Sequence, residues 1–140
     1  MMNSKAIEWV LRIAVAGEFI GHAMFAVGPF TAPFTLFSSP GKAEWAGWIA
    51  KLTGADPALA AQLLFLVGLA DIFVAIIVLL RPIRIVLLWA VFWGFWTALV
   101  RPLVGASFWD FIERFANWGA PLALLLLLGW PKTVREWFSK

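Results

Sequence analysis

The sequence predicts an all-α integral membrane protein, an up-and-down bundle of four transmembrane helices with a short interfacial helix between the first two. Hydrophobic residues make up 63% of the 140 residues and charged residues only 14%, and the mean hydropathy is +0.89. Soluble domains are about half apolar and about a quarter charged, whereas a stretch of about 20 apolar residues indicates a membrane crossing. We therefore expect one transmembrane domain that covers residues 1–140.

The first crossing, expected at about residues 6–28, contains three ionisable side chains. Ser4 precedes it as a candidate N-cap, and Gly28 and the proline after it end it. Arg12, Glu18 and His22 lie inside the stretch. A charged side chain at the centre of a membrane helix costs about 2.5 to 3.5 kcal/mol on insertion scales, so such groups turn toward polar partners. Helices elsewhere in the chain are expected to supply these partners.

A short amphipathic helix is expected at about residues 40–53. Ser38 or Ser39 can cap it and Gly54 can end it. Its apolar residues recur at helical spacing, while its charged residues lie elsewhere. The helix is expected either to lie in the membrane interface or to cap the bundle. The apolar positions are Trp45, Trp48, Ile49 and Leu52.

Three further crossings are expected at about residues 58–80, 83–100 and 110–130. Asp56 and Pro57 form a helix start, since aspartate favours the N-cap and proline the first helical position. The last crossing begins with several polar residues and continues into a very apolar run.

The distribution of Lys and Arg predicts the orientation. More basic residues flank the ends that share a side with the termini than flank the opposite loops, and the side richer in Lys and Arg faces the cytoplasm. We therefore expect a multi-pass protein of the cell inner (plasma) membrane with both termini cytoplasmic. The net charge of +3 is explained by orientation and anionic lipid contact, so no nucleic-acid partner is expected. The basic residues on the cytoplasmic side are Lys5, Arg81, Arg84, Lys132, Arg135 and Lys140.

Depth along the helices predicts two polar clusters. In the inner half, Arg12 and Asp71 are expected to form a structural ion pair that fixes helix register. In the outer half, pairs of polar residues four apart share helix faces at compatible depths. They are expected to surround a small ligand site with an aromatic wall, or otherwise to neutralise one another. This outer cluster comprises Glu18, His22, Trp93, Thr97, Arg101, Glu113 and Asn117.

The residue types limit the chemistry. The chain has no cysteine, which excludes thiolate metal sites and direct thiol chemistry. Two ligands on one helix plus a carboxylate are common by chance, so the combination of Glu18, His22 and Glu113 does not predict a metal site. The sequence contains none of the standard nucleotide-binding or hydrolase motifs. Whether the protein is an enzyme stays open.

Three segments resemble the DoxX-like family of small four-helix membrane proteins. They are the first helix from Arg12 to Ala26, the tryptophan-bearing segment from Glu44 to Gly54, and the helix from Leu64 to Leu80, which contains Asp71. Some members of this family are subunits of membrane thiosulfate:quinone oxidoreductases, and others are accessory or assembly proteins. The resemblance implies an accessory membrane protein and makes a quinone the ligand to consider.

Three functional hypotheses follow. The first is an accessory or small-molecule-binding subunit of a membrane oxidoreductase, with a quinone bound at the outer cluster. The second is a purely structural or assembly subunit of a larger membrane complex. The third is a small oligomeric transporter, which ranks last because the chain shows no internal repeat. Each hypothesis places the protein in a lipid bilayer with a membrane protein partner or a second copy of itself.

Overall fold

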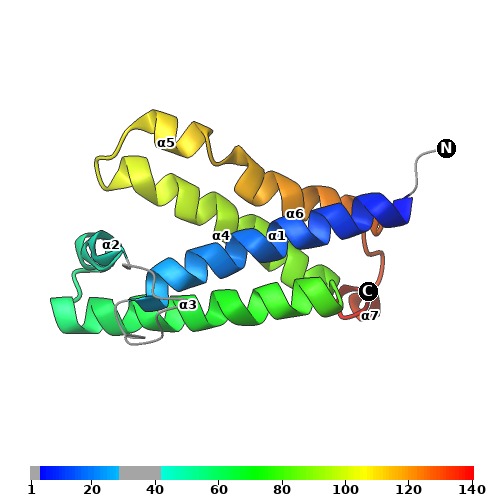
Figure 1. Cartoon of the computed structure of the whole chain (residues 1–140), viewed down its shortest axis with the longest axis horizontal. Helices are drawn as coiled ribbons and strands as arrows, with labels where there is room; N and C mark the ends of the chain where they lie inside the picture. The colour runs from blue at the N-terminus through cyan, green and yellow to red at the C-terminus, as the bar shows by residue number, and fades with distance from the viewer. Residues whose placement is uncertain (1–3, 29–41) are drawn as a thin grey trace. The chain divides into compact units, whose positions relative to one another are not determined.

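The structure is a computed structural model that describes residues 4–28 and 42–140. These residues are helical and contain no strand (Figure 1). The long helices are α1 (Ser4–Val27), α3 (Pro57–Leu80) and α4 (Arg84–Leu103), and the shorter ones are α2 (Ala43–Thr53), α5 (Phe108–Ile112), α6 (Phe115–Leu127) and α7 (Val134–Trp137). Among the described residues, three helices, α1, α3 and α4, are long and apolar enough to cross a membrane. The structure therefore confirms the all-helical class and is compatible with a membrane protein.

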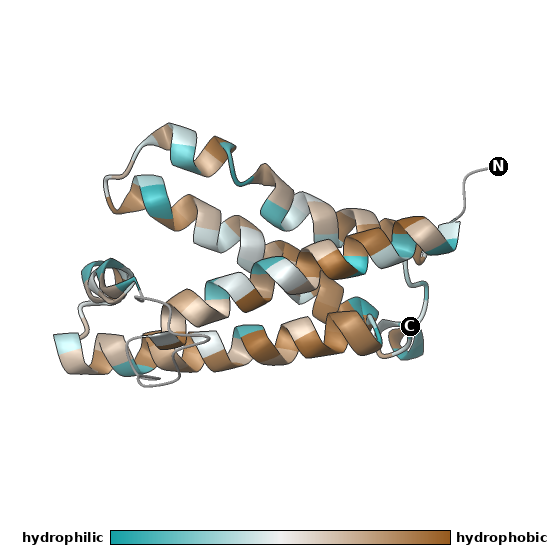
Figure 2. Ribbon diagram, in the orientation of Figure 1, coloured by the Kyte–Doolittle hydropathy of each residue, from teal (hydrophilic) through white to brown (hydrophobic). Residues whose placement is uncertain are grey.

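The side chains of α3 show an arrangement that suits a lipid environment. Its apolar residues include many exposed ones, and Leu80 is 74% exposed, whereas Asp71 in the same helix is 1% exposed. The C-terminal part of α3 is almost uniformly hydrophobic (Figure 2). Burying a carboxylate while exposing leucine and phenylalanine is unfavourable in water, but lipid-facing helices point polar groups inward.

The expected helix starts and ends are largely confirmed. Asp56 Oδ1 accepts hydrogen bonds from the backbone N–H groups of Ala58 (3.0 Å) and Leu59 (3.1 Å), so it caps α3. Gly54 ends α2 in the left-handed region at φ 73°, and its N–H donates to the carbonyl of Ala50. The prediction that Ser4 precedes the first helix as its N-cap is wrong, because Ser4 is the first residue of α1. The expected cap at Ser38 or Ser39 lies outside the described residues.

The fourth crossing expected at residues 110–130 is wrong as a continuous helix. The chain turns at Glu113 and Arg114, and α6 has only 13 residues, about 20 Å at 1.5 Å per residue, against a hydrocarbon core of about 30 Å. The backbone N–H of Arg114 bonds to Phe111 (3.2 Å), and its guanidinium donates to the carbonyl of Asp110 (2.8 Å). The side chain thus satisfies a carbonyl that would otherwise accept the N–H of Arg114 in a continuous helix.

The described residues group into two compact units. The first contains the start of α1, the end of α3 from Val74, and all of α4 to α7; within it, α4 packs against α5 and α6. The second covers Phe19–Phe73, which includes the end of α1, α2 and most of α3. In the second unit Trp45 of α2 packs with Ala26 of α1 and Leu64 of α3. Within this unit α2 therefore packs on α1 and α3, and the choice between an interfacial helix and a cap of the bundle stays a prediction.

The short helix α7 is held by reciprocal capping. Thr133 Oγ1 accepts the backbone N–H of Glu136 (3.4 Å), and Glu136 Oε2 accepts the backbone N–H of Lys132 (2.8 Å). This arrangement resembles a capping box, except that Glu136 accepts the N–H of Lys132 and not that of the N-cap residue Thr133. The hydrogen bond from Lys132 holds the pKa of the Glu136 carboxyl below its ordinary value.

We expect acid to release this cap. Because the pKa of Glu136 is lowered on folding, its contribution to α7 is complete at neutral pH and is lost as the pH falls below about 4. The amide chemical shift of Lys132, followed by NMR across this range, should report the loss. Glu136→Gln keeps an acceptor oxygen without a titrating group, so the Lys132 amide of that variant should show no such step. A step of equal size in Glu136→Gln would contradict the assignment.

Candidate functional site

The second unit contains a histidine paired with a buried carboxylate. His22 of α1 and Asp71 of α3 approach to 3.0 Å between Nδ1 and Oδ2. The side chain of Asp71 is 2% exposed and that of His22 is 20% exposed. This contact fixes the orientation of the imidazole ring and directs Nε2 away from Asp71.

A close helix contact positions this pair. Gly68 lies three residues before Asp71 on α3, and a Cβ atom at Gly68 would lie 2.5 Å from Cγ1 of Val27 and 3.2 Å from the carbonyl oxygen of Ala23. Only glycine permits α1 and α3 to approach this closely. Ala23 follows His22 directly, so the same contact that needs Gly68 also brings the imidazole to Asp71.

Helix α2 covers the imidazole with an aromatic ring. The Trp45 indole lies 4.5 Å from the His22 ring between centroids, at an interplanar angle of 35°. Trp48 stacks on Trp45 at 6.1 Å, and Phe25 meets Trp45 edge-on at 6.0 Å. The Lys42 ammonium lies 5.3 Å from the Trp45 ring centroid, within the range of a cation–π contact. The imidazole therefore lies in an aromatic, largely dry environment.

Two polar atoms at this site lack partners among the described residues. The indole N–H of Trp45 is buried and finds no hydrogen-bond acceptor there. Within the same part of the chain, Nε2 of His22 has no hydrogen-bond partner either. A buried donor left unsatisfied costs about 1 to 3 kcal/mol, so the indole N–H of Trp45 calls for an explanation. A bound molecule with hydrogen-bond acceptors would satisfy the indole.

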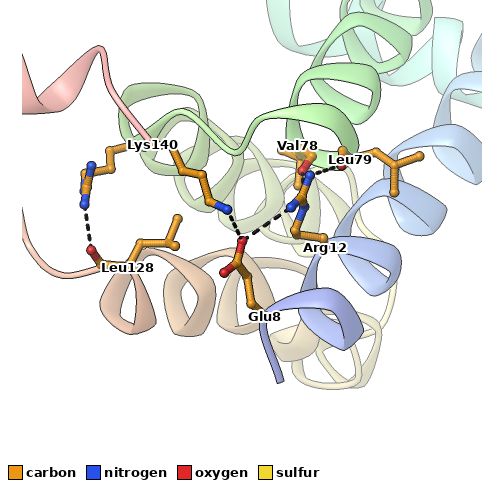
Figure 3. A network of polar contacts seen from close by, with 7 residues as sticks. Glu8, Arg12, Val78, Leu79, Leu128 and Lys140 are labelled. Atoms are coloured by element: carbon orange, nitrogen blue, oxygen red, sulfur yellow. Dashed lines mark hydrogen bonds and ion pairs between the residues drawn. The ribbon is translucent and has the colours of Figure 1, made fainter. Parts of the chain in front are cut away.

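The expected ion pair between Arg12 and Asp71 stays a prediction, because the two residues lie in different units and each has a partner within its own unit. Arg12 Nε donates to the carbonyl of Val78 (3.2 Å), a second guanidinium nitrogen donates to the carbonyl of Leu79, and Nη1 lies 3.3 Å from Glu8 Oε1. Figure 3 shows this network. The last carbonyls of α3 have no partner within their helix, and they attract a cation through the helix dipole as well.

The outer cluster divides between the two units. His22 lies in the second unit, while the other six residues lie in the first. Arg101 is buried and donates through Nη1 to the backbone carbonyl of Thr97 (2.6 Å). Glu113 is paired with Arg114 at the turn between α5 and α6. The common site of these seven residues stays a prediction.

Two aromatic or amide positions of that cluster have contacts of another kind. Trp93 stacks on Trp89 at 5.6 Å, and its indole N–H is buried without an acceptor among the described residues. The backbone of Asn117 packs against Gly94 of α4. Within the described residues, no group of three or more His, Asp or Glu side chains is placed to hold a metal ion.

Sequence reasoning missed Asp71 and Trp45 as the contacts of His22. Asp71 is the one acidic residue of α3 apart from its cap region, and depth alone could not decide between Arg12 and His22 as its partner. Trp45 was expected on an apolar face of α2, which is where it lies. The signal for its role was that a short helix rich in tryptophan follows directly in sequence after the helix that carries the only histidine.

No protein-family model, no curated protein and no solved structure matches this chain.

Proposed function

We propose that this chain is a small integral membrane protein that binds a planar small molecule, of the quinone class, at His22 and Trp45. The observation that carries the proposal is the coincidence of an oriented imidazole with a buried indole N–H, on the aromatic ring that covers it, for which residues 4–28 and 42–140 supply no acceptor. Ligand sites in proteins are mostly apolar and carry a few convergent polar groups.

The chemistry of a quinone head group suits these residues. Its two carbonyl oxygens accept hydrogen bonds, and its flat ring stacks on aromatic side chains. The indole N–H of Trp45 would donate to one carbonyl. His22 Nε2 would accept the proton of a quinol hydroxyl, while Asp71 keeps the imidazole oriented through Nδ1 (3.0 Å).

The wider setting is proposed as well. The resemblance to the DoxX-like family supports an accessory subunit of a membrane oxidoreductase. The basic residues near the termini support insertion in the cell inner membrane with both termini cytoplasmic. A membrane protein partner would supply the electron carrier for such a complex. The alternative is a purely structural subunit, in which the same residues only hold the helices together.

The test is the quinone content of the purified protein. We expect wild type, purified in mild detergent, to retain quinone that solvent extraction and mass spectrometry detect. His22→Gln keeps a donor toward Asp71 but lacks the ring, and Trp45→Phe removes the indole N–H. Each should weaken the binding of a short-chain quinone about tenfold, the effect of one hydrogen bond of about 1.4 kcal/mol.

Trp109→Phe serves as the matched control, because Trp109 is 75% exposed and lies outside the second unit. It should bind the short-chain quinone like wild type. Thermal unfolding of each variant separates a lost ligand from a lost fold. Unchanged quinone binding in a folded His22→Gln protein would overturn the site, and a stable partner complex without quinone would make the chain a structural subunit.

A further inference from the structure

The segment after α6 exposes apolar and basic side chains together. Trp130 (54% exposed), Val134 (78%) and Phe138 (65%) recur every four residues. Lys132 and Arg135 lie between them in sequence and are exposed as well. The side chain of Lys132 interacts electrostatically with the Glu136 carboxylate, and the described residues show no ion pair from Arg135. We call residues 130–140 the C-terminal strap.

Polar anchors hold the C-terminal strap at both ends. Arg84 donates to the carbonyls of Leu128 (2.7 Å) and Gly129 (3.0 Å) just before it, and to the carbonyl (3.2 Å) and hydroxyl (3.1 Å) of Ser139 near its end. Lys140 Nζ then lies 2.7 Å from Glu8 Oε1 of α1 (Figure 3). These bonds fix the backbone of the segment, so its exposed apolar groups belong to an ordered surface.

The acidic side chain of the C-terminal strap, Glu136, makes a hydrogen bond within the strap. The Glu136 carboxylate accepts the backbone N–H of Lys132 (2.8 Å). Trp137 is turned onto Trp130, edge to face at 5.5 Å. The segment therefore exposes an excess of basic over acidic side chains, two against one, beside tryptophan, valine and phenylalanine. This is the composition of protein segments that lie at the membrane surface, where rings enter the headgroup region and basic groups meet phosphates.

We propose that the C-terminal strap binds anionic phospholipid headgroups, with Lys132 and Arg135 on the phosphates and with Trp130, Val134 and Phe138 inserted among the upper acyl chains. A zwitterionic headgroup also carries a phosphate, but its own cation offsets the attraction. The exposed basic side chains of Lys132 and Arg135 outnumber the one carboxylate side chain of the C-terminal strap, Glu136, so this surface is expected to prefer phosphatidylglycerol to phosphatidylcholine.

Local fluorescence quenching can test this preference, because the chain has no cysteine. A fluorophore attached to Val134→Cys, in the full-length protein in bilayers, is quenched by phospholipids brominated on their acyl chains. Comparing brominated phosphatidylglycerol with brominated phosphatidylcholine gives the relative affinity of the two lipids at that position. We expect at least about a tenfold preference for phosphatidylglycerol, which two juxtamembrane basic residues can supply.

Two controls make the result specific. Lys132→Gln with Arg135→Gln should reduce the preference to near one, whereas Lys51→Gln with Arg81→Gln removes as many charges elsewhere and should leave it intact. A fluorophore at Leu66→Cys, on an exposed position within α3, should show no preference between the lipids.

Three results would overturn the proposal. They are equal quenching by the two lipids at Val134→Cys, an equal loss of preference in both double variants, and a fluorophore that no lipid reaches because another subunit covers it. Quinone binding by these same proteins is measured separately, so failure at the C-terminal strap leaves the site at His22 untouched.

Discussion

Replacing Arg12 with alanine is expected to lower the free energy of unfolding by about 2 to 4 kcal/mol, since hydrogen bonds to charged groups contribute about 1.5 to 3 kcal/mol and stranded partners add to the loss. Arg12 is 4% exposed and donates to the carbonyls of Val78 and Leu79. Its guanidinium also lies 4.1 Å from the centroid of the Trp9 ring. The substitution would leave the end of α3 uncapped within the first unit.

Unfolding in detergent, followed by circular dichroism against increasing denaturant, measures the effect. Arg12→Lys should recover part of the lost stability, because an ammonium keeps the charge near Glu8 but cannot direct several donors in the fixed fork of a guanidinium. Arg135→Ala is the matched control, because that side chain is exposed, and it should unfold like wild type. Equal stability of Arg12→Ala and Arg135→Ala would show that the cap contributes nothing.

The fate of Arg12 shows which structural features the sequence could predict. Helix positions followed from hydropathy and from local signals, and Asp56 with Pro57 began α3 where expected. The hydrogen-bond partners of polar side chains could not be predicted in this way, because several groups lie at the same depth in the bundle. Depth pairs Arg12 with Asp71, but a guanidinium has five donors, and two of its nitrogens donate to carbonyls at the end of α3 that lack partners in their own helix.

The break between α5 and α6 was unpredictable for a related reason. The polar residues at the start of the expected fourth helix read as the first turns of an amphipathic helix. In the structure the Arg114 side chain donates to the carbonyl of Asp110. This carbonyl therefore keeps a hydrogen bond although the helix is interrupted there. A hydropathy average over many residues does not register that one carbonyl accepts from a side chain and not from the backbone. It therefore cannot separate one long helix from two short ones.

The sequence predicts the histidine of the candidate site but not the residues that contact it. His22 is predictable as a site residue because it is the only histidine and lies within an apolar helix. Its partner and its aromatic cover depend on which faces of α1, α2 and α3 meet, and Gly68 permits the close contact between α1 and α3. One missing Cβ atom among many apolar residues is a weak signal in a sequence. It becomes informative only when the neighbouring helix is known.

A second glycine leads to the other large expected effect. Gly94 of α4 faces the backbone of α6, where a Cβ atom at this position would lie 2.6 Å from the carbonyl oxygen of Asn117 and 2.8 Å from its carbonyl carbon. Pro121, four residues after Asn117, has no N–H to bond that carbonyl. The carbonyl of Asn117 therefore lies against α4 at a place where the helices touch through backbone alone.

Gly94→Ala is expected to lower the free energy of unfolding by about 1 to 3 kcal/mol, the usual cost of overpacking a tight contact. The clash is with backbone atoms, which cannot turn aside as a flexible side chain can. Gly119→Ala on α6 is the control, because a Cβ atom there meets nothing within 4 Å, and it should be neutral or stabilising by up to about 1 kcal/mol through helix propensity. Denaturant unfolding of both variants decides the matter: if Gly94→Ala is as stable as Gly119→Ala, α4 and α6 do not meet at this backbone contact.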